Sequence, residues 1–147
     1  MSEQIFAIDN YIKTAFGIGE VDVRTYSPLT LAYIGDGIFD LIIRSVVVGK
    51  GNTKAATLHK RTSKIVKAET QAKLVEAIMD MLTEEEHDVF KRGRNAKSFT
   101  MAKNASMSDY RKATGFEALA GYLYVTDRFD RLVELTKEGL KRLDIAL

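Results

Sequence analysis

The sequence predicts an all-α protein, and three observations support this expectation. Apolar residues recur at intervals of three and four along most of the chain, which is the period of helices that bury one face. One proline and ten glycines in 147 residues leave few points at which a helix must end. No linker or internal repeat divides the chain, so we expect a single helical domain over residues 1–147.

The first two predicted helices cover residues 3–16 and residues 28–48. Residues 17–26 between them have no helical period and are predicted to be a connector. The second helix begins where Ser27 can cap free N–H groups and Pro28 can occupy the first helical position without losing a hydrogen bond. The residues expected on the buried face of the first helix are Ile5, Ile8, Ile12 and Phe16. Those expected in the buried stripe of the second are Leu31, Ile34, Ile38, Leu41 and Ile42.

Residues 53–81 have a continuous helical pattern that fits either one long helix or two helices with a kink. The next helix is predicted to begin at Thr83, because Glu86 follows three residues later and the two form a capping box. Residues 93–107 lack a helical period and combine basic with small polar side chains. We therefore expect a loop there.

Two helices are predicted in the last part of the chain. Ser108 and Asp109 begin the first of them, which runs through Tyr124. Asp127 is expected to cap the second, which buries Phe129, Leu132, Leu140 and Leu143.

The composition excludes several classes of protein. The chain has no cysteine, which excludes a disulfide framework and a zinc site with cysteine ligands. The N-terminal segment lacks a basic region followed by a long apolar run, and no stretch approaches 18 uncharged apolar residues. We expect a cytoplasmic protein that does not enter a membrane.

The formal net charge of +2 conceals a strongly uneven distribution of charge. Residues 41–68 contain seven basic residues and no acid, and residues 91–112 contain seven basic residues and one acid. The net negative charge is concentrated in residues 1–40 and 69–90, where acids outnumber basic residues by four and by six. Two basic segments in a nearly neutral chain indicate either a local site for a polyanion or two solvated helix faces.

Asp36 is a candidate functional residue because it lies between Gly35 and Gly37 inside the most apolar predicted helix. Each glycine weakens a helix interior by roughly 1 kcal/mol relative to alanine, so close packing of another backbone or of a ligand is the expected compensation. A carboxylate on a mostly buried helix must be paired or bind a cation, since burial of an isolated charge is very costly. The alternative is an Asp36 that faces solvent or pairs with Arg44 or with a lysine from another helix.

Glu117 is the second candidate, since it lies among small and apolar residues within 113–125 and follows Gly115. Two such carboxylates on crossing core helices could share Mg²⁺, a cation that takes one or two protein carboxylates and phosphate oxygens. A buried ion pair with lysine or arginine is the alternative for Glu117. Spacing alone does not decide between them.

These segments resemble a known family. The segment LTLAYIGDGIFD (29–40) resembles the ribonuclease III signature, and ATGFEALAGYLYV (113–125) resembles the second acidic helix of that family. With the basic segment KRGRNAKS (91–98), nearly the whole chain is similar to Mini-ribonuclease III, the short bacterial form with a catalytic domain and no separate double-stranded RNA-binding domain.

The resemblance implies a ribonuclease III-like helical fold, a homodimer, and Mg²⁺-dependent hydrolysis of double-stranded RNA that leaves 5′ phosphates and 3′ hydroxyls. It also implies a role in maturing the large-subunit (23S) ribosomal RNA precursor, with a large-subunit ribosomal protein as a further candidate partner. Asp36 and Glu117 are the residues carried over as catalytic metal ligands. Where the longer enzymes have further acids, this chain has Leu29, Ala32 and Thr114, which leaves the number of metal ions open.

The resemblance also gives the basic segments a function. Duplex RNA is bound through its shape, phosphates and 2′-hydroxyls, so lysine and arginine suffice and little sequence preference is expected. The residues expected to contact RNA are Lys60, Arg61, Lys64 and Lys67 in the first basic segment and Arg92, Arg94, Asn95, Lys97 and Lys103 in the second.

Two other functions compete with an endoribonuclease. One is a catalytically silent relative that binds structured RNA or ribosomal particles, for which the acidic pair would not be needed. The other is a helical dimerisation module, which offers no reason for two basic segments.

Overall fold

The computed structural model describes residues 7–97 and 106–147, and all of their regular structure is helical, which confirms the predicted all-α class. Two short 3-10 turns, η2 (Val23–Thr25) and η3 (Met79–Met81), accompany the α-helices. None of the helices that these residues form is long and apolar enough to cross a membrane. The α-helices are α1 (Ile8–Ala15), α2 (Pro28–Gly49), α3 (Ala55–Val66), α4 (Ala68–Ala77), α5 (Glu84–Asn95), α6 (Met107–Val125) and α7 (Phe129–Arg142).

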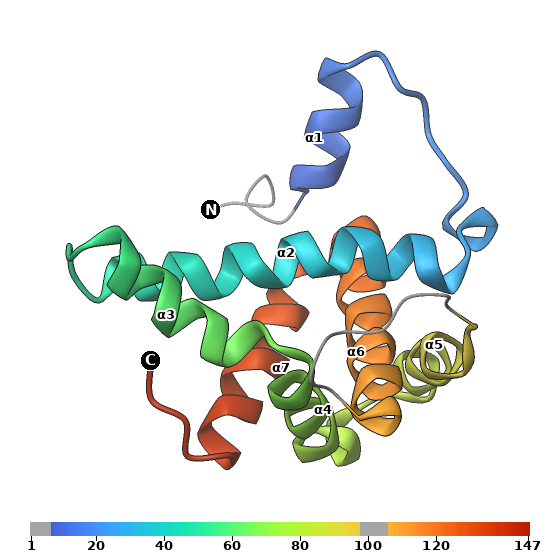
Figure 1. Cartoon of the computed structure of the whole chain (residues 1–147). Coiled ribbons are helices and arrows are strands. Elements are labelled where there is room, and N and C mark those ends of the chain that lie inside the picture. The colour runs from blue at the N-terminus through green and yellow to red at the C-terminus, as the bar shows by residue number, and fades with distance from the viewer. Residues whose placement is uncertain (1–6, 98–105) are drawn as a thin grey trace.

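Helix α6 is the centre of the fold. It packs against α2, α4, α5 and α7, and α2 lies across it, as Figure 1 shows. A helix surrounded in this way must be apolar or small on every side. The sequence of α6 meets this requirement, because it buries Gly115, Phe116, Leu119 and Gly121 on different faces. The Phe116 ring meets Phe39 of α2 edge to face, with ring centroids 5.0 Å apart.

The backbones of α2 and α6 touch where they cross. A Cβ atom placed on Gly35 would overlap the carbonyl oxygen of Glu117 and lie 2.7 Å from the amide nitrogen of Gly121. A Cβ atom on Gly121 would in turn overlap the carbonyl oxygen of Leu31. The predicted close packing is therefore confirmed for Gly35, but not for Gly37, where an added Cβ would meet nothing within 4 Å.

The start of α2 follows the prediction. The hydroxyl of Ser27 accepts a hydrogen bond from the Thr30 amide at 3.1 Å, and Pro28 is the first helical residue. The predicted buried stripe is correct for Leu31 and Ile42 and wrong for Leu41, which is half exposed. Ile34 and Ile38 are partly buried.

Residues 53–81 form two α-helices, which resolves the alternative that the sequence left open. The chain leaves helical geometry at Lys67, whose ψ of 155° is extended. The break exposes carbonyl groups at the end of α3, and two buried side chains of α4 satisfy them. The Thr70 hydroxyl donates to Lys64 O at 2.7 Å, and the Gln71 amide donates to Val66 O at 2.8 Å.

The capping box at the start of α5 is confirmed. The Glu86 amide donates to the Thr83 hydroxyl, and the Thr83 amide donates to the Glu86 carboxylate. Glu86 is almost fully buried, and Arg131 of α7 pairs with both of its carboxylate oxygens at 2.9 Å. This pair ties the beginning of α5 to α7.

Three predicted boundaries in the second half of the chain are wrong. Helix α5 continues to Asn95, so part of the expected loop 93–107 is helical, and residues 98–105 of that loop lie outside the described residues. Helix α6 begins at Met107, because Ser106 caps it. Asp127 does not cap α7, because its φ of 60° places it in the left-handed turn between α6 and α7.

Helix α1 is shorter than predicted and does not bury its apolar face. It covers only Ile8–Ala15, has no buried residue, and stands on the side of α2 away from α3, α4 and α5 (Figure 1). Ile12 is 46% exposed and Phe16 is 78% exposed, so the predicted burial of these two residues is wrong. Ile5 lies outside the described residues.

The two glycines around Asp36 provide a direct test of this crossing. We expect Gly35→Ala to destabilise the protein by at least about 1–3 kcal/mol, because its methyl group overlaps backbone atoms that cannot move independently. Gly37→Ala is the matched control, since it has room and should gain up to about 1 kcal/mol from helix propensity. Thermal or urea unfolding of both variants gives the two values. Equal stabilities would contradict the observed crossing.

Candidate functional site

The crossing of α2 and α6 brings the two predicted acids together. Asp36 follows the contact residue Gly35 on α2, and Glu117 is the residue of α6 whose carbonyl faces Gly35. The two carboxyl groups lie within hydrogen-bonding distance of each other. Asp36 is exposed to solvent and Glu117 is half-buried. The pair therefore lies where the buried crossing of α2 and α6 reaches the protein surface.

The surroundings of Glu117 disfavour its negative charge. Burial, the hydrogen bond to Asp36 and the negative charge of Asp36 together raise the pKa of the Glu117 carboxyl to about 8. A contact with the Gln71 amide acts in the opposite direction and lowers the pKa. At neutral pH the Glu117 carboxyl is therefore mostly protonated when no metal is bound, as expected for an acid buried beside another acid.

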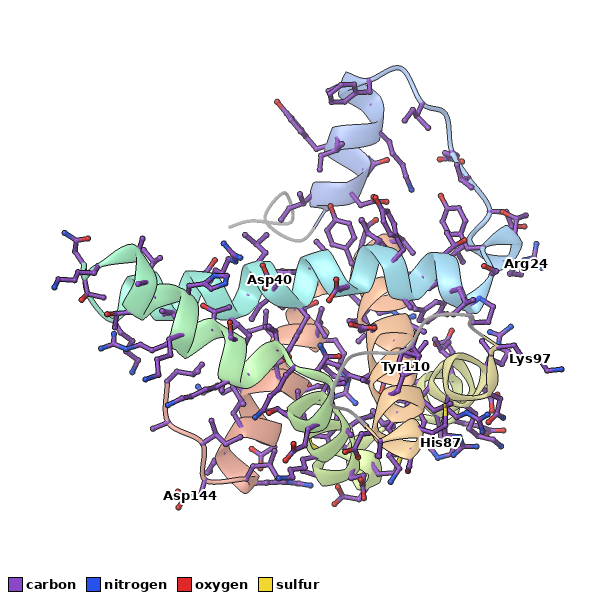
Figure 2. The ribbon with its side chains drawn as sticks, in the orientation of Figure 1. Arg24, Asp40, His87, Lys97, Tyr110 and Asp144 are labelled. Carbon is purple, nitrogen blue, oxygen red and sulfur yellow. The ribbon has the colours of Figure 1, made fainter. Side chains whose placement is uncertain are left out.

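The structure gives no support to the ion-pair alternatives for these acids. Arg44 pairs with Asp40 at 2.6 Å, one turn beyond Asp36 on α2 (Figure 2 labels Asp40), so it is not the partner of Asp36. Asp36 is nevertheless exposed, as the alternative supposed. Glu117 forms no ion pair with any described residue. The close neighbour of each acid is the other acid.

This donor set fits a hard divalent cation. Two carboxyl groups that share a proton offer oxygen ligands, and a cation can replace that proton. No group of three or more acidic, histidine or cysteine side chains that could hold a metal occurs among the described residues. The Thr114 hydroxyl donates to Tyr110 O at 3.0 Å and stays within its own helix. Mg²⁺ accepts such a sparse set, because it retains several of its waters.

Gln71 is a site residue that the sequence analysis missed. It is 1% exposed, lies on α4, and contacts the Glu117 carboxyl. Glutamine on a helix is usually a surface residue. The signal that could have identified it is its position three residues before Leu74 and seven before Ile78, within the apolar period of the helix.

The first group of predicted RNA-contact residues lies along one exposed side of α3. Lys60, Arg61 and Lys64 are on this helix, and Lys67 lies at the break that follows it. All four are exposed, and none forms an ion pair with a described residue. Their charges are therefore not neutralised within the described part of the chain.

The second group lies at the end of α5 and is not continuous with the first, since α3 and α5 lie against different parts of α2 (Figure 1). Arg94 packs over the Phe90 ring and donates to Asn95. Arg92 lines a pocket of about 590 Å³ together with three acids and Arg24, and it forms no ion pair with a described residue. Lys97 follows the helix and is exposed (Figure 2), and Lys103 lies outside the described residues.

Comparisons with known proteins agree with this geometry. Residues 29–128, which include both acids, match the model of the Ribonuclease III domain. The chain is 47% identical over 83% of its length to a protein from Enterococcus faecalis named Mini-ribonuclease 3, of which it covers 94%. It is 51% identical over 83% of its length to a Mini-ribonuclease 3 from a Thermoanaerobacter species, of which it covers 86%.

A solved structure is also similar. The crystal structure of a protein from Fusobacterium nucleatum aligns with a TM-score of 0.74 at 30% identity, covering 83% of this chain and 98% of that one. The match of the domain model includes the α2–α6 crossing and its two carboxyl groups. The chain belongs to the ribonuclease III family, and the relatives to which its sequence is similar are named Mini-ribonuclease 3.

Proposed function

We propose that this protein is a metal-dependent endoribonuclease that hydrolyses double-stranded RNA. The observation that carries the proposal is the contact between the Asp36 and Glu117 carboxyl groups within the part of the chain that matches the ribonuclease III domain. A structural pair of acids without a cation would be a continuous cost to folding, because burial and the neighbouring charge of Asp36 oppose ionisation of Glu117. A catalytic metal site would explain why both carboxyl groups are present despite this cost.

Asp36 and Glu117 are the residues that would hold Mg²⁺. The bound ion would activate a water and stabilise the negative charge that develops on the scissile phosphate. The half-buried position of Glu117 limits the rotation of its carboxylate, while the exposure of Asp36 leaves the pair open to the substrate. Attack of water on phosphorus and cleavage of the P–O3′ bond would leave a 5′ phosphate and a 3′ hydroxyl, with a proton passing to the departing 3′ oxygen.

The RNA duplex would be held by basic side chains at two places. The unpaired cations of α3 are suited to phosphates, since each can release a counterion from RNA without breaking an internal ion pair. The basic end of α5 would supply the second contact. Such contacts would recognise the shape and backbone of the duplex, so we expect little dependence on base sequence.

A homodimer and a ribosomal RNA substrate complete the proposal. Helix α2 exposes Tyr33, Leu41 and Val48 at 84%, 50% and 59%, and these apolar side chains are suited to a second copy of the chain. The names of the similar relatives support an RNA substrate. The large-subunit (23S) ribosomal RNA precursor, with or without a ribosomal protein, is the substrate we propose.

Cleavage of duplex RNA by the purified protein tests the central proposal. We expect Asp36→Asn and Glu117→Gln each to lower the cleavage rate in Mg²⁺ by about 10²–10³-fold, as expected for loss of a group that supports developing charge. Asp40→Asn is the matched control, because it removes a carboxylate one turn away that pairs with Arg44. A wild type that binds the duplex without cutting it would instead be the catalytically silent relative.

The pH dependence of metal binding tests the shared proton. Because the pKa of Glu117 is raised to about 8, a proton must leave before the metal can bind this carboxylate at lower pH. The apparent affinity for Mn²⁺, measured by calorimetry, should therefore rise about tenfold per pH unit up to about pH 8 and then level off. In Glu117→Gln this rise should be absent. An affinity in the wild type that is constant from pH 6 to 8 would contradict the proposal.

The salt dependence of RNA binding tests the basic side of α3. Replacing Lys60 and Lys64 by alanine should weaken duplex binding and reduce the slope of log affinity against log salt by about one for each phosphate that the protein no longer neutralises. The control replaces Lys137 and Lys141, which are exposed with the same spacing on α7 and should leave the slope unchanged. The triple alanine variant of Arg92, Arg94 and Lys97 tests α5 in the same way. An unchanged slope would exclude the residues concerned.

A further inference from the structure

Gln71 is an unusual residue for the interior of a helical domain. Its side chain is 1% exposed, and its neighbours Ala72, Leu74 and Val75 on α4 are buried apolar residues. Its Nε2 donates to Val66 O at 2.8 Å, but its Oε1 is buried and has no hydrogen-bond partner among the described residues. An unpaired buried oxygen is a cost to folding that an apolar side chain of similar size would avoid.

The second contact of this amide is the Glu117 carboxyl group. Helix α4 packs against α6, and the Gln71 side chain lies near enough to that carboxyl to lower its pKa. An amide nitrogen carries two hydrogens, so Nε2 can donate to Val66 O and to the carboxylate together. The bond to Val66 O fixes the amide at the break between α3 and α4, and the fixed amide restricts the rotation of the Glu117 side chain.

We propose that Gln71 is a positioning residue that holds the Glu117 carboxylate beside Asp36 in the orientation that binds the metal. This inference rests on the proposed function, because it assigns Gln71 a role in the same metal site. Residues that orient a metal ligand without touching the metal commonly change metal affinity by 10–100-fold when they are replaced. Gln71 fits this description, since it contacts the ligand from a fixed point in the core.

A variant of the neighbouring residue Thr70 can distinguish a positioning role of Gln71 from a merely structural one. Thr70 is also buried in the first turn of α4, and its hydroxyl donates to Lys64 O at the end of α3. Both residues thus donate a hydrogen bond to a carbonyl group at the same helix break. Of the two, only Gln71 also interacts with Glu117. Thr70→Val is therefore the matched control for Gln71→Met, which keeps the volume of the side chain and removes its amide.

The experiment measures Mn²⁺ binding to the full chain by calorimetry, thermal unfolding, and cleavage of duplex RNA over a range of Mg²⁺ concentrations. We expect Gln71→Met to weaken Mn²⁺ binding by about tenfold or more and to raise the Mg²⁺ concentration needed for half-maximal cleavage, with cleavage recovering at high Mg²⁺. Thr70→Val should leave Mn²⁺ affinity unchanged. Gln71→Asn, which retains an amide but withdraws it by one methylene, makes the same comparison if Gln71→Met does not fold.

Two results would overturn the inference. One is a Gln71 variant that folds and binds Mn²⁺ as tightly as the wild type. The other is an equal loss of Mn²⁺ affinity in Thr70→Val. That result would mean that Gln71 only stabilises the break between α3 and α4. A wild type that binds Mn²⁺ but leaves duplex RNA intact would contradict the proposed function alone, because the comparison of Mn²⁺ affinities would still decide the role of Gln71. A wild type that binds no Mn²⁺ would overturn both.

Discussion

The contact between the backbones of α2 and α6 is the constraint on which the rest of the structure depends. Gly35 and Gly121 allow the two helices to approach until the atoms of one backbone touch the other. This close approach places the Asp36 and Glu117 side chains next to each other, with Asp36 exposed to solvent and Glu117 partly buried. Helices α4, α5 and α7 pack around α6 and hold it in this position.

The pair of acids illustrates a conflict between stability and chemistry. Burial and the proximity of Asp36 both oppose ionisation of Glu117, whereas the contact with Gln71 favours it. A protein selected only for stability would replace one of the acids with an apolar residue. Retaining both leaves a site that is neutralised only in part by a proton and that a divalent cation can neutralise further. Such local violations of packing rules are typical of functional sites.

The sequence predicted those features that depend on neighbouring residues in the chain. The cap at Ser27, the capping box at Thr83 and the requirement for a close approach at Gly35 follow from local rules, and the structure has all three. The two acids could be chosen because charge is conspicuous within an apolar segment. Their family resemblance then indicated that they act together.

The features that were missed or left open depend on tertiary contacts. The helix break at Lys67 contains neither proline nor glycine, and it is stabilised by the buried side chains of Thr70 and Gln71. The apolar face of α1 could not be recognised as exposed, because its pattern is that of a buried helix. Gln71 itself was overlooked, since its contact with Glu117 lies between helices that are distant in sequence.

The crossing of α2 and α6 also determines when the site can form. Three helices, α3, α4 and α5, separate the two crossing elements in the chain, so the central contact is non-local and its formation must overcome the entropy of closing a long loop. During synthesis, a nascent chain that ends before α6 contains Asp36 but not the helix that brings Glu117 to it. The acidic pair is therefore assembled late, in a chain whose helices α1 to α5 have already been made.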